Sequence, residues 1–176
     1  MIIDCLSKAM MLFILYNVIA ILSFGIPESL TKTFYKYKEH NDAFKFIYYA
    51  FIALMCILLT PCWLKLSETN FSQDIAIINS LILLFTGALP IILKSDEDND
   101  KPLVEILEKL ISYCCSMFFI IWIVAATPYW WIVLLIAIIV TLISIITKSW
   151  NKCYTYWIEM TAFISIFISI LLKYIM

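Results

Sequence analysis

Six long apolar runs constrain what this chain can fold into more than any other feature of its sequence. They cover about residues 9–26, 46–64, 75–93, 103–127, 129–147 and 155–173. A helix of roughly 18–20 apolar residues crosses the hydrocarbon core of a bilayer, which is about 30 Å thick. The sequence therefore predicts an all-α integral membrane protein, a bundle of about six transmembrane helices. Four or five spans would result if the first run lay on the membrane surface or the fourth and fifth formed a re-entrant pair.

The composition supports a membrane protein without a separate soluble domain. Hydrophobic residues make up 64% of the 176 residues, 14% are charged, and the mean hydropathy is +0.99. A soluble domain of this size would carry about a quarter charged residues. We expect a single transmembrane domain over residues 1–176. The first run is longer than a usual signal-peptide core and lacks a small-x-small cleavage site, so we expect a retained span.

The lysines predict the orientation of the spans. All twelve basic residues are lysine. Nine fall on one side of the predicted spans and three on the other, and the lysine-rich side of a membrane protein faces the cytoplasm. The three are Lys8, Lys65 and Lys173. We therefore expect a multi-pass protein of the cell inner membrane, in contact with lipid, with both termini outside the cytoplasm.

The sequence carries no pattern typical of catalysis or of a bound metal. The six cysteines form no C-x-x-C pair, and His40 is the one histidine. No H-E-x-x-H, G-x-S-x-G or glycine-rich phosphate motif is present. Without arginine there is no bidentate group for phosphate, and the net charge of −1 gives no attraction to nucleic acid. We expect a protein that is not an enzyme and that uses no cofactor.

Residues 94–102 read KSDEDNDKP and are the most polar stretch of the chain. The four acids are Asp96, Glu97, Asp98 and Asp100. Their D-x-D-x-D spacing opens an EF-hand calcium loop, but Lys101 stands where that loop needs glycine and Leu107 where it needs glutamate. Three interpretations remain. The stretch is a solvated connector, an exposed negative patch that docks a basic cytosolic partner, or, against these two mismatches, a site for calcium or magnesium.

The helix that follows this stretch is amphipathic at its start. Leu103, Leu107, Leu110 and Cys114 share one face, and the polar residues Glu105, Glu108, Lys109 and Ser112 lie elsewhere. This spacing indicates a helix that begins in the headgroup zone and enters the hydrocarbon near Leu110.

Three polar side chains inside the apolar runs are candidate functional residues: Asn17, Asn79 and Glu159. An intramembrane carboxylate is a functional-site hypothesis by default. Glu159 lies only one turn into its run, and the alternative is that it reaches the interface or pairs with Lys148 or Lys152. The two asparagines fit hydrogen bonds between helices, which contribute about 0.6–2 kcal/mol each.

Small residues recur at helical spacing in the last two runs. They are Thr141, Ser144, Thr161, Ser165 and Ser169. Small side chains let helix backbones approach closely in lipid, where the hydrophobic effect does not drive association. These stripes predict packing faces, within one chain or between chains, and we expect a homo-oligomer.

Two functions fit these features. In the first, the protein is a non-enzymatic membrane scaffold or sensor whose cytoplasmic loops recruit a soluble partner. In the second, it is an oligomeric pore or ion-channel subunit with a path lined by Asn17, Asn79 or the Ser/Thr stripes. The first is favoured because no run shows the polar stripe that a water-filled pore needs. In size and composition the chain resembles small membrane proteins of bacterial conflict systems, in phage defence or toxin immunity, which implies antiviral defence as a setting and assigns no residues.

Neutralising the acidic stretch tests whether it docks a partner. Changing its four acids to asparagine or glutamine removes the charge and keeps the shape. We expect membrane insertion to survive, because orientation follows lysines far more than acids. Partner recruitment, measured by co-purification, should fall, and wild-type recruitment should weaken above roughly 0.15 M salt, where the Debye length is about 8 Å. Unchanged recruitment in the neutralised variant would make the stretch a connector only.

Overall fold

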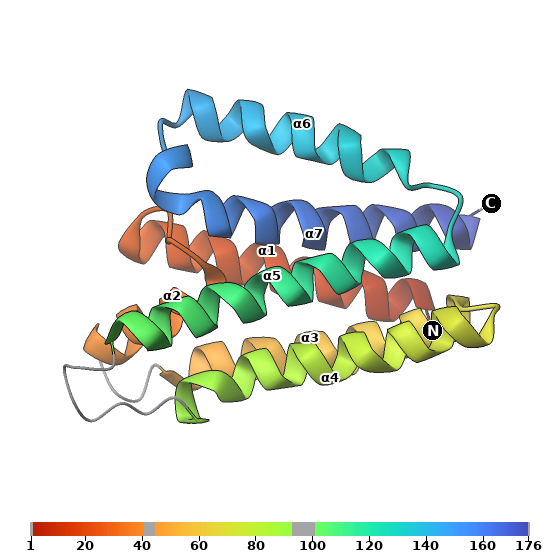
Figure 1. Ribbon diagram of the computed structural model, residues 1–176, viewed down its shortest axis with the longest axis horizontal. Helices are drawn as coiled ribbons and strands as arrows, with labels where there is room; N and C mark the ends of the chain where they lie inside the picture. Colours follow the sequence, from red (N-terminus) through yellow and green to blue (C-terminus); the bar gives the residue numbers. More distant parts are fainter. Residues whose placement is uncertain (1, 41–44, 93–100, 176) are drawn as a thin grey trace.

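The computed structural model describes residues 2–40, 45–92 and 101–175, which contain helices and no strand (Figure 1). The acidic stretch at Asp96, Glu97, Asp98 and Asp100 lies outside the described residues. The helices are α1 (Ile2–Phe24), α2 (Leu30–His40), α3 (Lys45–Leu66), α4 (Asn70–Ile92), α5 (Lys101–Ala126), α6 (Trp131–Ile146) and α7 (Trp150–Ile175). The prediction of an all-α membrane bundle is confirmed.

Five of the described helices are long and apolar enough to cross a membrane: α1, α3, α4, α5 and α7. The fifth apolar run forms α6, which has 16 residues. At 1.5 Å per residue α6 is about 24 Å long, shorter than the roughly 30 Å of a bilayer core. The structure thus contains a helix in each of the six apolar runs, of which five reach spanning length.

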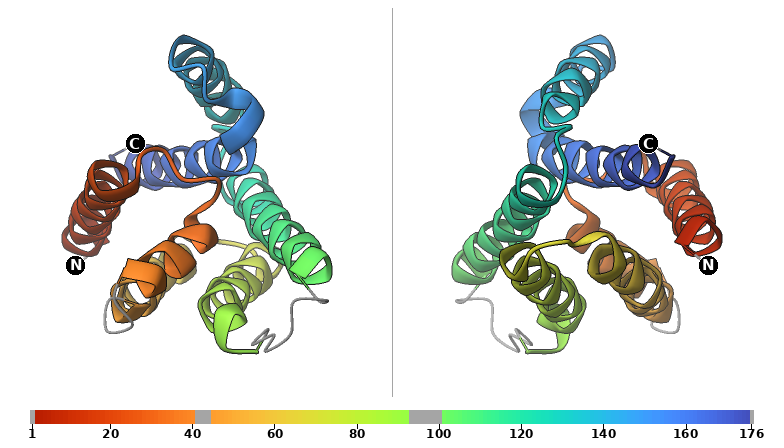
Figure 2. Two further views of the ribbon diagram at one scale, coloured as in Figure 1. Left: turned by 90° about the vertical axis from the view of Figure 1, so that its left-hand side faces the viewer. Right: turned by 90° about the vertical axis from the view of Figure 1, so that its right-hand side faces the viewer.

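The five long helices surround a common centre. Neighbours in this ring are α1 and α3, α3 and α4, α4 and α5, and α5 and α7, and α7 returns to α1 (Figure 2). The helix α6 lies outside the ring and packs on α7, with Ile132, Ile136 and Val140 against Ile164 and Ile168. The ring places one face of every long helix toward the same interior.

The helix α2 occupies a stretch that the sequence pattern marks as a polar loop. Ser29 caps it, since its hydroxyl oxygen accepts the Lys32 N–H at 3.1 Å. Leu30, Phe34 and Tyr37 recur at helical spacing and are buried. This apolar face packs on α3 and α4 at one end of the ring. A short amphipathic helix therefore closes that end.

Aromatic side chains fill the middle of the ring. The Phe163 ring of α7 lies 5.0 Å from that of Phe13 in α1 and 5.1 Å from that of Phe119 in α5, measured between centroids. The Trp63 ring of α3 lies 5.3 Å from that of Phe119. Four helices thus meet through rings at the centre of the bundle.

The contact between α3 and α4 is close because α4 carries a glycine. A Cβ atom at Gly87 would lie 2.7 Å from Cγ2 of Ile52, nearer than side-chain carbons approach. Ala76 and Ser80, also on α4, are buried. Small residues here let two backbones approach, as expected in lipid.

The small residues of α6 and α7 are buried within one chain. Ser144, Ser165 and Ser169 have no exposed surface, and Thr141 and Thr161 are half-buried. Ser144 donates its hydroxyl to the Thr141 carbonyl at 2.7 Å. These side chains therefore pack helices inside the chain, and the homo-oligomer stays a prediction that these contacts do not test.

Both termini lie at one end of the bundle (Figure 1). The connections 67–69 and 127–130 are at that end, and the connections 25–29 and 147–149 are at the other, beside α2. The lysines of α2 and Lys152 lie at the same end as the connections 25–29 and 147–149. The uneven distribution of lysines along the sequence therefore corresponds to two opposite ends of the bundle.

Single cysteines at the two ends test the predicted orientation. Glu68→Cys and Lys152→Cys are suitable because both positions are exposed, whereas native Cys153 is buried. In intact cells an impermeant thiol reagent should label Glu68→Cys, and Lys152→Cys should react only after lysis. Labelling of the unmodified protein gives the background. The reverse pattern would place the termini in the cytoplasm.

Candidate functional site

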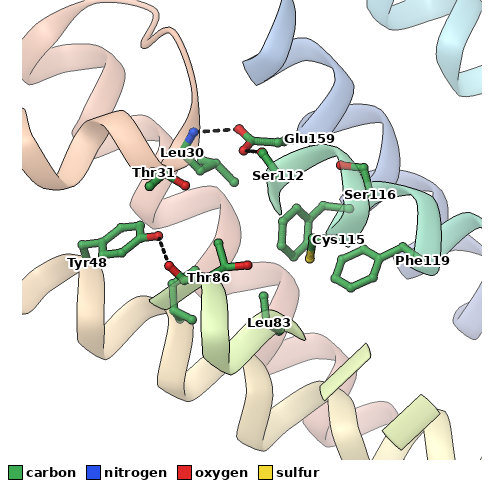
Figure 3. A pocket seen from close by; sticks show the side chains of 12 residues that line it. Leu30, Thr31, Tyr48, Leu83, Thr86, Ser112, Cys115, Ser116, Phe119 and Glu159 are labelled. Carbon is green, nitrogen blue, oxygen red and sulfur yellow. Dashed lines mark hydrogen bonds between the residues drawn. The ribbon is translucent and has the colours of Figure 1, made fainter. Parts of the chain in front are cut away.

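Glu159 of α7 lies inside the bundle, at the end that α2 closes (Figure 3). Its Oε2 accepts the backbone N–H of Leu30 at 2.7 Å, and its Oε1 accepts the Ser112 hydroxyl. Leu30 is the first residue of α2, and the first N–H groups of a helix have no partner within the helix. The carboxylate of α7 therefore caps α2 while a hydroxyl of α5 holds its other oxygen.

No lysine pairs with Glu159 among the described residues. Lys148 and Lys152, the partners considered from the sequence, are exposed. The backbone bends at Cys153, where φ is −122° and ψ is 25°, so that the first turn of α7 departs from the line of the helix. The N-terminus of α2, equivalent to roughly half a positive charge, is the positive group that faces the carboxylate.

A small cavity adjoins the Glu159 carboxylate. Its polar lining comes from Thr31, Tyr48, Thr86, Ser112, Ser116 and Glu159, and Phe119 and Phe163 belong to its apolar wall. The cavity leaves about 20 Å³ to the centres of water-sized molecules. One buried water needs roughly 10–15 Å³ by that measure. Five helices, α2, α3, α4, α5 and α7, thus enclose a space the size of one or two water molecules, and its accessible wall is mostly apolar.

The hydroxyl groups of this cavity are oriented by acceptors of the protein itself. Tyr48 donates to the Thr86 carbonyl at 3.1 Å (Figure 3). Thr86 donates its hydroxyl to the Ile82 carbonyl at 2.8 Å. Ser112 donates to Glu159. The buried Thr31 hydroxyl has no hydrogen-bond partner among the described residues. Three of the hydroxyl protons are therefore committed to acceptors of the protein, and that of Thr31 is not.

A second buried carboxylate also receives a hydrogen bond from α2. Glu108 of α5 accepts the Tyr35 hydroxyl at 2.6 Å. Burial and this hydrogen bond raise the pKa of Tyr35 above its ordinary value. Glu108 and Thr155 line a polar pocket together with Lys32, Lys109 and Lys152. Glu108 lies four residues before Ser112 in α5, and Thr155 lies four residues before Glu159 in α7. This outer pocket is therefore one helical turn from the cavity.

The two asparagines have different surroundings. Asn17 of α1 accepts the Tyr156 hydroxyl of α7 at 2.9 Å and donates to the Phe13 carbonyl at 2.8 Å. Asn79 of α4 is fully buried, and neither of its side-chain polar atoms has a partner among the described residues. Neither residue lines the cavity at Glu159.

The sequence reading missed most of the partners of Glu159. Ser112 is recognisable as a candidate, because it follows Glu108 by four residues and so shares its helix face. Leu30 carries no such signal, since it contributes its backbone N–H. Tyr35 and Thr31 belong to a stretch that reads as a loop, which hides their alignment on a helix.

No family model, curated protein or solved structure matches the chain.

A double-mutant cycle tests whether the Glu159 contacts hold the bundle together. Glu159→Ala leaves the Leu30 N–H and the Ser112 hydroxyl without an acceptor, and each buried unsatisfied donor costs about 1–3 kcal/mol. We expect Glu159→Ala and Ser112→Ala to lower the free energy of unfolding, with a coupling of about 0.5–3 kcal/mol between them. Denaturant unfolding in mild detergent measures both quantities.

The matched control for this cycle is Asp74→Ala, which removes an exposed carboxylate of α4. Its effect should stay within about 0.5 kcal/mol. Equal effects of Glu159→Ala and Asp74→Ala would show that the buried hydrogen bonds contribute nothing to stability.

Proposed function

We propose that this chain is a non-enzymatic membrane sensor and scaffold, which self-assembles and recruits a cytosolic partner through its lysine-rich end. One observation carries the proposal: α2 is bound to the bundle through hydrogen bonds to two buried carboxylates, Leu30 to Glu159 and Tyr35 to Glu108. A polar helix held in this way can be docked or released by a local change. Such an element is what a sensor requires.

The length of α2 supports this role. It has 11 residues, and isolated helices shorter than about 12–15 residues are marginal in water. Its helical state therefore depends on docking against α3 and α4 and on the two carboxylates. Loss of those contacts would free a segment that carries Lys32, Lys36 and Lys38. A partner that binds the released form would shift the population toward it.

The filled interior of the ring favours a sensor over a pore. Phe13, Phe119 and Phe163 meet at its centre, where a water-filled path through one chain would have to pass. Asn17, one of the candidate pore-lining residues, is engaged by Tyr156. The described outward faces carry apolar side chains such as Leu22, Ile57 and Ile138. Lipid suits these faces better than an aqueous channel between chains.

The cytosolic partner is expected to be a protein with a basic surface, received by Asp96, Glu97, Asp98 and Asp100. A cytosolic partner requires the acidic stretch to face the cytoplasm. This corresponds to a protein of the inner membrane with both termini outside the cytoplasm. Bacterial conflict systems, in phage defence or toxin immunity, are the setting that the size and composition of the chain suggest.

Removing one hydrogen bond to α2 tests the sensor. Tyr35→Phe keeps the ring and deletes the hydroxyl that Glu108 accepts. A hydrogen bond to a charged group contributes about 1.5–3 kcal/mol, so the released form should become about tenfold more populated or more. The reactivity of Thr33→Cys toward a soluble thiol reagent in liposomes measures that release, because Thr33 is fully buried while α2 is docked. Tyr37→Phe is the control, because the Tyr37 hydroxyl has no hydrogen-bond partner among the described residues, and it should change nothing.

The same liposomes distinguish a sensor from a pore. We expect wild-type protein and Tyr35→Phe both to leave them tight to ions. Steady conductance from wild-type protein would favour the pore. Equal Thr33→Cys labelling in Tyr35→Phe and Tyr37→Phe would remove the support for a released helix.

A further inference from the structure

We propose that the outer pocket between α2, α5 and α7 binds the phosphate group of an anionic phospholipid. This is the pocket to which Lys32, Lys109 and Lys152 contribute. The proposal deepens the proposed function, because it names what the site beside α2 would sense. It rests on that function only for its consequence, and the binding itself is argued from position, charge, hydrogen-bond donors and size.

The outer pocket lies where membrane-spanning segments begin. Lys109 is in the first turn of the apolar span Ile106–Ala126, and Lys152 is in the first turn of the span Trp150–Ile175. Both lie at the end of the bundle beside α2 (Figure 1). Charged side chains at the ends of spans reach the level of the lipid headgroups. This lysine-rich end is the one predicted to face the cytoplasmic leaflet, which carries anionic lipid, and basic pockets between helices on that side bind lipid headgroups.

The charges of the pocket leave room for one negative group. Among the described residues that line it, three are lysines and two are glutamates. Neither Lys32 nor Lys152 has a carboxylate within ion-pair distance among the described residues. Of the two carboxylates, Glu108 accepts the Tyr35 hydroxyl and Glu28 is exposed. A phosphodiester carries a single negative charge and would balance the excess. Lysine binds phosphate as a point charge, so this site needs no arginine.

Buried hydroxyl groups add hydrogen-bond donors. Ser29 and Thr155 line the pocket and are only 6% and 3% exposed. The Ser29 oxygen accepts the Lys32 N–H, and its own proton has no acceptor among the described residues. A buried donor without an acceptor is costly. A phosphate oxygen in the pocket would accept this proton while the neighbouring ammonium groups hold its charge.

The size of the pocket suits part of a headgroup. It leaves about 40 Å³ to the centres of water-sized molecules, and one buried water needs roughly 10–15 Å³ by that measure. The space therefore takes about three oxygen-sized groups. The two unesterified oxygens of a phosphodiester fit within it. The glycerol and acyl chains would remain outside, in the bilayer.

A bound phosphate would connect three helices, because Lys32 belongs to α2, Lys109 to α5 and Lys152 to α7. A ligand that binds the docked form and not the released form stabilises the docked form by mass action. Anionic lipid would therefore keep α2 on the bundle. Removal of that lipid would favour release, which gives the proposed sensor a signal at the membrane surface.

Thermal unfolding of purified protein in mild detergent tests the site. Phosphatidylglycerol, phosphatidylcholine and inorganic phosphate are titrated separately at constant ionic strength, which holds screening fixed. We expect phosphatidylglycerol to raise the melting temperature and to saturate. Phosphatidylcholine should act more weakly, because its own ammonium balances its phosphate, and inorganic phosphate lacks the chains that hold it in the micelle. Native mass spectrometry of wild-type protein should retain phosphatidylglycerol in preference to phosphatidylcholine, and this reading needs no variant to fold.

Single lysine variants locate the binding. Lys32→Ala and Lys152→Ala should each need about fivefold more phosphatidylglycerol for the same rise in melting temperature. Lys38→Ala is the matched control, because it removes the same charge from an exposed position of α2 outside the pocket. It should respond to the lipid as the wild type does.

Three results would overturn the proposal. The first is an equal effect of phosphatidylglycerol and phosphatidylcholine in both measurements. The second is an equal loss in Lys38→Ala and Lys152→Ala, which would assign the effect to diffuse surface charge. The third is a rise that inorganic phosphate produces at the same concentration as the lipid, which would make free phosphate the ligand. Lipid binding is measured without any partner, and α2 release is measured by Thr33→Cys labelling, so either proposal can fail alone.

Discussion

The hydrogen bond from the Leu30 amide to the Glu159 carboxylate joins two groups that each need a partner. A carboxylate inside a helix bundle is costly without donors around it, and the first amides of a helix have no acceptor within that helix. The structure places the N-terminus of α2 against α7, so each group satisfies the other. The closed end of the ring, the cavity and the docking of α2 all depend on this contact, with Ser112 and the Tyr35–Glu108 pair supporting it.

The membrane explains how the long helices are turned. In α5 the apolar face noted in the sequence points outward: Leu110 is 55% exposed and Cys114 is exposed. The face with Glu108, Ser112 and Ser116 is buried in the ring. In a soluble bundle the apolar stripe would face the core, but lipid accepts it here and polar groups gain from facing one another. The sequence predicts an apolar and a polar face on α5. Whether the surroundings are lipid or water determines which of the two faces the bundle interior.

The helical class and the positions of the long helices follow from the apolar runs. The site does not, because its contacts join residues 129 and 47 positions apart, Leu30 with Glu159 and Ser112 with Glu159. The helical spacing of Leu30, Phe34 and Tyr37 is present in the sequence. Four lysines in the surrounding stretch nevertheless make it resemble a polar loop. Glu159 stands out by its charge in an apolar run, and its partners become visible only in three dimensions.

The length of α6 has a consequence for the surrounding lipid. This helix lies outside the ring on α7, and its roughly 24 Å fall short of the hydrocarbon thickness. Trp130 and Trp131 at its start and Lys148 just beyond its end are exposed, and side chains of these kinds settle at headgroup level. If α6 crosses the bilayer, hydrophobic mismatch would draw the two leaflets together beside it. A thin bilayer would accommodate this flank of the protein with less deformation than a thick one, so the lipid composition around the chain bears on how α6 rests against α7.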